Sequence, residues 1–294
     1  MRITNNVLLR TTLAGIQDNL RSIQRSTERV ASGHWFRRAS DDPGIAGTVQ
    51  RTDSQLEALN QYQSNIGSAR SRLMLEETVL GQVTDLLTRA RGLATREGSS
   101  NANTDSRLIA KKEIDQLRQM IVELGNTRFE GLYLFGGAHA DRPPLQFDEH
   151  GNIVINEIIP ASNEVEISAE RLAQVNHDAG AIFDESGVVA ALDALSAALG
   201  ADDREGVAAS GSLLSDSLDE IQALLGDLGA RMIRLDIAEA NIDALDVNLR
   251  TFRSDMTEVE FEEAMTELIG RQTALQAALV ATSRILHTTL TDYL

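Results

Sequence analysis

Apolar residues recur along most of the chain at alternating spacings of three and four, which is the repeat of a helix that packs along one stripe. Both ends of the chain carry such a stripe. The first stripe consists of Leu9, Leu13, Ile16, Leu20, Ile23 and Val30. The second runs from Phe261 to Tyr293 and includes Leu268, Leu275, Leu279 and Leu286. The pattern therefore predicts an amphipathic helix at each end.

These terminal helices need partners, because most of the stability of a helix in water comes from packing its apolar face. The simplest partner for each stripe is the other end of the chain, or the same helix of a neighbouring copy. We expect the termini to be poorly ordered until they pack. We also expect the following residues of the first stripe to contact Leu268, Leu275, Leu279 and Leu286: Leu9, Leu13, Ile16, Leu20 and Ile23.

Three further helices are predicted between the ends. Residues 44–97 form one long helix, because its apolar residues fall seven apart; it begins after Ser40-Asp41-Asp42-Pro43, an acidic N-cap followed by proline. A third helix begins near Asp105, a candidate N-cap, and continues to Leu124. A fourth keeps the four-three spacing over residues 214–249.

Residues 138–187 have a different pattern. They hold three of the four prolines, and Ile153-Val154-Ile155 and Val165-Glu166-Ile167 are typical of short strands. The fold class is therefore mainly α with a small β-rich insert, an elongated rod of long antiparallel helices whose two ends meet. We expect three parts: a terminal pair (1–43 with 255–294), a helical rod (44–137 with 188–254) and an outer insert (138–187).

Composition mainly excludes functions. The chain has no cysteine and 4% aromatic residues, so a disulfide framework, a thiolate metal site and a catalytic cysteine are excluded. The five histidines are scattered, and no phosphate-binding or nucleophile motif occurs. Asp41-Asp42 is better explained as a helix cap than as a catalytic acid–base pair. Trp35-Phe36 is better explained as a buried anchor at a helix junction than as a platform for a ligand. We therefore expect no enzyme activity, no cofactor and no metal.

The charge of the chain is unevenly distributed. The net charge is −17, of which residues 1–142 contribute +3 and residues 143–294 contribute −20. Residues 1–38 carry +5 and residues 254–294 carry −5. Opposite charge favours pairing of the two ends, although charge alone also fits solvated helix faces. Arg21, Arg25 and Arg29 form a basic stripe, but the acidic chain argues against nucleic acid as its partner.

The N-terminal segment contains Arg10 within its apolar stretch and Asp18 soon after, so no signal-peptide core is expected. No apolar run is long enough to span a membrane. We expect a cytosolic protein, or one exported by a route without a cleaved leader.

Several motifs resemble those of the flagellin family. They are Ala31-Ser32-Gly33, Ala39-Ser40-Asp41-Asp42-Pro43, residues 87–94 (with Gly92 in place of the usual acidic residue), Asn126-Thr127-Arg128-Phe129-Glu130-Gly131 and residues 272–277. The resemblance implies that Ser32, Gly33, Asp41, Asp42 and Pro43 form the junction between the first two helices. It also makes Leu87, Arg89, Arg91 and Leu93 candidates for axial contacts between subunits.

The resemblance covers two kinds of family member. Residues 131–137 and Pro143-Pro144-Leu145-Gln146-Phe147 look like those of hook–filament junction members rather than of filament flagellins. A junction member would be a structural part of the extracellular flagellum, exported unfolded with the help of an export chaperone. Its partners would be copies of itself in a helical layer, hook-associated protein 1 and flagellin. The alternatives are a short filament-forming flagellin and a helical binding module that acts through the basic stripe.

Overall fold

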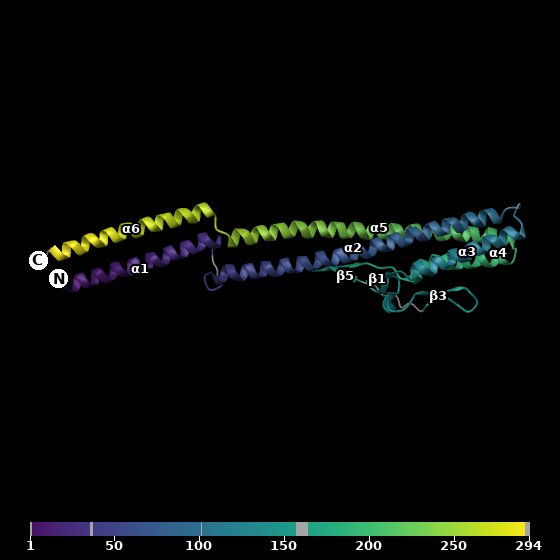
Figure 1. Cartoon of the computed structure of the whole chain (residues 1–294), viewed down its shortest axis with the longest axis horizontal. Coiled ribbons are helices and arrows are strands. Elements are labelled where there is room, and N and C mark those ends of the chain that lie inside the picture. The colour runs from purple at the N-terminus through teal and green to yellow at the C-terminus, as the bar shows by residue number, and fades with distance from the viewer. Residues whose placement is uncertain (1, 36–37, 101, 157–163, 292–294) are drawn as a thin grey trace. The chain divides into compact units, whose positions relative to one another are not determined.

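The computed structural model describes residues 2–35, 38–100, 102–156 and 164–291. Most of them are helical, which confirms the predicted fold class, mainly α with a small β-rich insert. The α-helices are α1 (Arg2–Ser32), α2 (Pro43–Glu97), α3 (Thr104–Gly125), α4 (Val188–Gly200), α5 (Arg204–Thr257) and α6 (Phe261–Thr291) (Figure 1).

The chain divides into two compact units, and the finer division into three parts stays a prediction. A terminal unit combines Met1–Ala58 with Ala244–Leu294, and a larger unit comprises Leu59–Asp243. The β-rich residues belong to the larger unit. The long helices α2 and α5 each contribute to both units.

The start of α2 follows the predicted cap. The Asp42 carboxylate accepts hydrogen bonds from the backbone N–H groups of Gly44 and Ile45, both at 3.1 Å. Pro43 occupies the first helical position, where its missing N–H costs nothing. The cap of α3 differs from the prediction, because Asn103 rather than Asp105 accepts the N–H of Ser106, at 2.7 Å.

The core of the larger unit lies along the seven-residue repeat of α2. Ile66, Leu73, Leu80 and Leu87 are completely buried. α5 supplies the facing residues, among them Leu214, Ile221, Leu228 and Leu235, while α3 and α4 pack against each other and add Ile114, Ile121, Leu192 and Leu195. Burying one such side chain stabilises the fold by about 1.5–3 kcal/mol, so the repeat specifies this packing.

Three two-stranded antiparallel hairpins form the β-rich part. They are β1 (Arg128–Phe129) with β2 (Leu132–Tyr133), β3 (Leu145–Phe147) with β4 (Ile153–Ile155), and β5 (Glu164–Ser168) with β6 (Arg171–Gln174). The first hairpin begins ten residues before the expected insert. Its turn residues, Glu130 and Gly131, both have positive φ (52° and 86°), which a two-residue hairpin turn requires.

Candidate assembly interface

The two terminal helices lie side by side within one chain. α1 and α6 pack along their length in the terminal unit (Figure 1). Ala264 and Leu268 of α6 are buried, and Ile16, Ile23, Val30 and Leu275 are half-buried. The structure thus pairs the two stripes without a second copy.

The pairing covers only part of the predicted stripes. Leu13, Leu20 and Leu279 are 55%, 50% and 49% exposed, so the helix pair covers them only in part, and their predicted contacts stay a prediction. The physical reason is that a pair of helices covers a narrow seam, whereas these stripes are wider than one partner can cover. The side chains of Leu9 and Leu286 lie outside the described residues.

Opposite charge contributes little to this pairing. Among the described residues, one ion pair joins α1 to α6: Arg29 Nη1 lies 3.8 Å from Glu267 Oε2. Arg21 instead pairs with Asp18 of its own helix at 3.2 Å, and Arg271 pairs with Glu267 at 2.5 Å. Two of the three arginines of the basic stripe, Arg21 and Arg29, are therefore already paired with carboxylates.

The junction after α1 is fixed to the junction before α6. The backbone N–H of Val259 donates to the carbonyl of Gly33 at 2.9 Å, and that of Trp35 donates to the carbonyl of Thr257 at 2.9 Å. His34 and Glu258 lie opposite each other in an antiparallel bridge. Gly33 has φ +70°, a value that ends α1 and favours glycine.

The predicted junction residues each have a local role. Ser32 Oγ accepts the N–H of His34 at 3.3 Å, and the Asp41 carboxylate accepts the N–H of Arg38 at 3.1 Å. These contacts, with the Asp42 cap, shape the turn between α1 and α2. What Ser32, Gly33, Asp41, Asp42 and Pro43 do in assembly remains a prediction.

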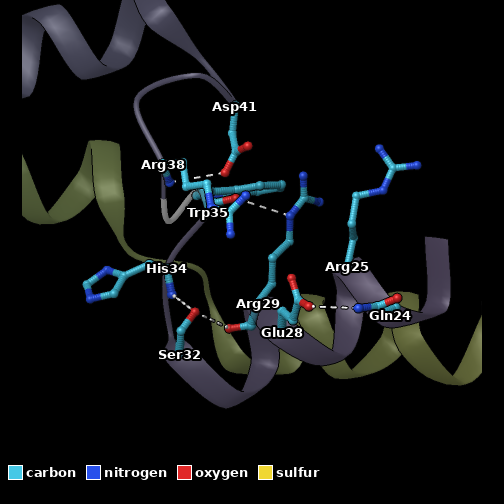
Figure 2. A pocket seen from close by; sticks show the side chains of 9 residues that line it. All are labelled: Gln24, Arg25, Glu28, Arg29, Ser32, His34, Trp35, Arg38 and Asp41. Carbon is cyan, nitrogen blue, oxygen red and sulfur yellow. Dashed lines mark hydrogen bonds between the residues drawn. The ribbon is translucent and has the colours of Figure 1, made fainter. Parts of the chain in front are cut away.

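A hollow of about 750 Å³ opens beside this junction (Figure 2). We call it the basic hollow; its lining consists of Gln24, Arg25, Glu28, Arg29, Ser32, His34, Trp35, Arg38 and Asp41. The guanidinium of Arg29 lies 4.8 Å from the centre of the Trp35 ring, and its Nε donates to the Trp35 carbonyl at 3.2 Å. Trp35 is 39% exposed, so the expected buried anchor is wrong for this residue; Phe36 lies outside the described residues.

The four axial candidates divide into two pairs. Leu87 and Leu93 are 0% and 1% exposed and belong to the core of the larger unit, so they cannot contact another subunit. The expectation fails for them because the stretch lies in a helix with a buried face. Arg89 and Arg91 are exposed: Arg89 pairs with Glu113 of α3 at 2.5 Å, and Arg91 donates to Ser215 of α5 at 3.2 Å.

A buried cluster of charged side chains joins the segment after β6 to α2 and α5. One ring nitrogen of His177 contacts Glu76 of α2, and the other lies 3.2 Å from Asp227 of α5. Ionised carboxylates only accept hydrogen bonds, so both contacts are satisfied when both ring nitrogens carry protons. Arg231 also binds Asp227, at 2.5 Å, and donates to the carbonyl of Asn176 at 3.1 Å.

Two charged groups at this cluster, the half-buried Arg72 and the more exposed Asp227, have shifted pKa values. Burial lowers the pKa of Arg72, whose guanidinium donates to the carbonyl of Leu134. Burial raises the pKa of Asp227, but hydrogen bonds and charge from Arg231 and His177 outweigh it, so the net pKa is lowered. The sequence gives one weak signal for this cluster, the isolated Glu76 at a position of the apolar stripe.

Two classes of site are not found in the described part of the chain. Within residues 2–35, 38–100, 102–156 and 164–291, no three metal-binding side chains converge. No helix in those ranges has the length and apolar character that crossing a membrane needs.

Comparisons with known proteins agree with the motifs. The family model for the bacterial flagellin N-terminal helical region matches residues 3–140, and that for the C-terminal helical region matches residues 212–294. Flagellar hook-associated protein 3 of Escherichia coli is 26% identical over 96% of each chain, and flagellin of Bacillus subtilis is 24% identical over 95% of this chain and 94% of its own.

Solved structures show the same fold. The structure of a flagellar hook-associated protein from Vibrio parahaemolyticus superposes with a TM-score of 0.68 at 24% identity, over 74% of this chain and all of that one. FlgL of Xanthomonas campestris gives 0.62 at 17% identity, over 69% of this chain and 99% of its own. With both helical regions matched in order, the chain belongs to the bacterial flagellin family.

Proposed function

We propose that this chain is a structural subunit of the bacterial flagellum that joins the hook to the filament. The observation that carries the proposal is the apolar surface left open on the paired terminal helices. Leu13, Leu20 and Leu279 are about half exposed on helices that are already paired. Exposed apolar surface of this kind marks an interface with another protein.

The partners follow from this role. Copies of the chain form a helical layer, because head-to-tail contacts that do not close generate a helix rather than a finite oligomer. Hook-associated protein 1 borders the layer on one side and flagellin on the other. The chain is exported unfolded, with an export chaperone, and acts outside the cell. This role requires no catalytic group, cofactor, metal, nucleic acid or membrane.

The region after the first hairpin favours a junction protein over a short filament flagellin. Leu134 and Phe135, within the stretch that resembles junction members, are buried in the core of the larger unit. The Phe135 ring packs edge-on against Phe183, with 6.0 Å between ring centres. Hook-associated protein 3 of E. coli and flagellin of B. subtilis both match nearly the whole chain, and the identity to the first is higher by a small margin, 26% against 24%.

Deletion of the gene tests the proposal. Negative-stain images of the deletion strain should show hooks without filaments, and flagellin should accumulate in the medium. A strain that keeps normal filaments would contradict the proposal. Purified chain added to filament fragments separates the two family roles: a junction protein stops at a thin layer, whereas a filament flagellin elongates long filaments.

A further inference from the structure

Two cations of the basic hollow have no carboxylate partner among the residues that the structure describes. Arg25 donates through its Nε to the carbonyl of Arg21 at 3.4 Å, and no described carboxylate lies within ion-pair distance of its guanidinium. The same holds for the guanidinium of Arg38, whose backbone N–H donates to Asp41. Arg29, in contrast, is held by Trp35 and Glu267. The basic hollow thus holds two guanidinium groups, those of Arg25 and Arg38, that have no carboxylate partner among the described residues (Figure 2).

A surface of opposite charge is present in the same terminal unit. Exposed carboxylates gather around the start of α6, and we call this group the acidic edge: Glu258, Glu260, Glu262 and Glu263. Among the described residues, none of these carboxylates forms an ion pair with a cation. The edge is therefore an acidic surface without a described cation, opposite in charge to Arg25 and Arg38, although the carboxylates of Glu28 and Asp41 also line the hollow.

We propose that the basic hollow of one copy binds the acidic edge of the next copy. This inference rests on the proposed function, because it assigns one contact of the helical layer. Arginine suits the contact, since its planar guanidinium binds a carboxylate through two parallel hydrogen bonds.

The contact has a geometric consequence. The hollow and the edge adjoin at the bridge between His34 and Glu258 but share no residue, so a contact between the hollow of one copy and the edge of another is head-to-tail and leaves one free hollow and one free edge on every pair. Repetition of that contact extends a layer instead of closing a dimer. The charge contact also sets direction and register, a role that the exposed leucines alone cannot provide because apolar contact is not directional.

Site-directed cross-linking tests the contact directly, because the chain has no cysteine of its own. Two full-length variants, Arg38→Cys and Glu262→Cys, are produced together in the deletion strain, and isolated flagella are treated with a mild oxidant. A disulfide-linked dimer that requires both variants is expected, because each chain holds one thiol and only a contact between copies can join them. Arg38→Cys with Glu220→Cys, which replaces an exposed glutamate of α5 in the larger unit, is the matched control. No dimer, or as much dimer in the control, overturns the proposal.

Charge reversal supplies the second test in cells. Arg25→Glu with Arg38→Glu, or Glu262→Arg with Glu263→Arg, should each lower the number of filaments per cell about tenfold, because like charges then face each other. All four changes in one chain should restore filaments, since every contact regains opposite charges. Arg234→Glu, at an exposed position of α5, controls for added negative charge. Circular dichroism of each purified variant verifies that it folds.

The results separate this inference from the proposed function. If the deletion strain already has normal filaments, the junction role fails. If deletion removes filaments but both reversal variants restore them fully, and no cross-link forms, the junction role stands and the contact between hollow and edge is wrong.

Discussion

The larger unit and the terminal unit are built from helices with the same four-three repeat, yet they bury it to different extents. In α2, Ile66, Leu73 and Leu80 have no exposed surface. In α1, Leu13 and Leu20 at equivalent positions of the repeat are about half exposed. The repeat thus indicates which face of a helix is apolar, whereas the number of neighbouring helices decides whether the chain itself covers that face.

The polar contacts of the two units differ in the same way. The larger unit encloses charged groups, such as Glu76 against His177 and Arg118 against Asp193 at 2.5 Å. The ion pair that joins α1 to α6 is longer, 3.8 Å, and a third of each side chain is exposed. Buried charges require their partners, so they specify one packing. The terminal unit lacks that constraint, which suits a surface completed by other subunits.

The largest expected effect comes from His177→Ala in the larger unit. Removal of the imidazole leaves the fully buried Glu76 without its partner, and breaking a buried pair in this way costs about 3–5 kcal/mol. Urea unfolding of the purified chain, followed by circular dichroism, measures the loss. His150→Ala, at an exposed histidine of the β3–β4 hairpin, should change the free energy of unfolding little. Equal effects of the two variants would mean that the buried cluster adds no stability.

A pair of leucine variants tests the difference in burial itself. Leu87→Ala removes a completely buried side chain and should cost about 2–5 kcal/mol. Leu20→Ala removes one that is half exposed, and surface changes of this kind stay within about 0.5 kcal/mol. Denaturant unfolding of both variants measures the loss of unfolding free energy in each. A similar cost for the two would show that the terminal unit of the isolated chain buries its stripe after all.

The sequence predicted the helices well because each depends on local repeats and caps. The boundaries of α2 follow from Asp42, Pro43 and the apolar spacing, all within a short stretch of chain. The strands Ile153–Ile155 and Glu164–Ser168 also lie where alternation predicted them. α4 was not predicted as a separate helix, because most of its positions are apolar and give no clear amphipathic period.

The sites were less predictable because they depend on contacts between distant segments. His177, Glu76 and Asp227 come from three separate parts of the chain, and only the folded larger unit brings them together. The sequence could not separate the four candidates at 87–93 into buried and exposed residues, because a motif does not indicate which of its side chains face the core. Leu87 proved buried and Arg89 exposed.

Acid should weaken the larger unit through Asp115. Burial raises the pKa of this carboxyl, but hydrogen bonds from Lys111 and Ser196, together with Arg118, outweigh burial and lower it below its ordinary value. A lowered folded pKa stabilises the protein at pH values above the unfolded pKa, about 3.9, and that contribution is lost as the pH falls through the folded value. Asp115→Asn should therefore flatten the fall in stability below about pH 4. Urea midpoints measured across this range provide the comparison.

The control for this titration is Asp219→Asn, at an exposed aspartate of α5. This variant should lose stability on acidification as steeply as the wild-type chain does. The loss of unfolding free energy on acidification could also become equally small in both variants. That result would attribute the loss to general charge repulsion rather than to the contacts of Asp115.

The smallest expected effect on stability is that of Arg89→Ala. Its ion pair with Glu113 lies at the surface of the larger unit, with 59% of the Arg89 side chain exposed, and such pairs contribute about 0–1 kcal/mol. Because the neighbouring Leu87 and Leu93 are core residues, changing them would confuse unfolding with loss of assembly. Arg89→Ala leaves the fold intact, so it isolates the axial contact predicted for this stretch. Fewer filaments in a strain that carries only this variant, with an unchanged unfolding midpoint, would place Arg89 between subunits; normal filaments would limit it to the bridge between α2 and α3.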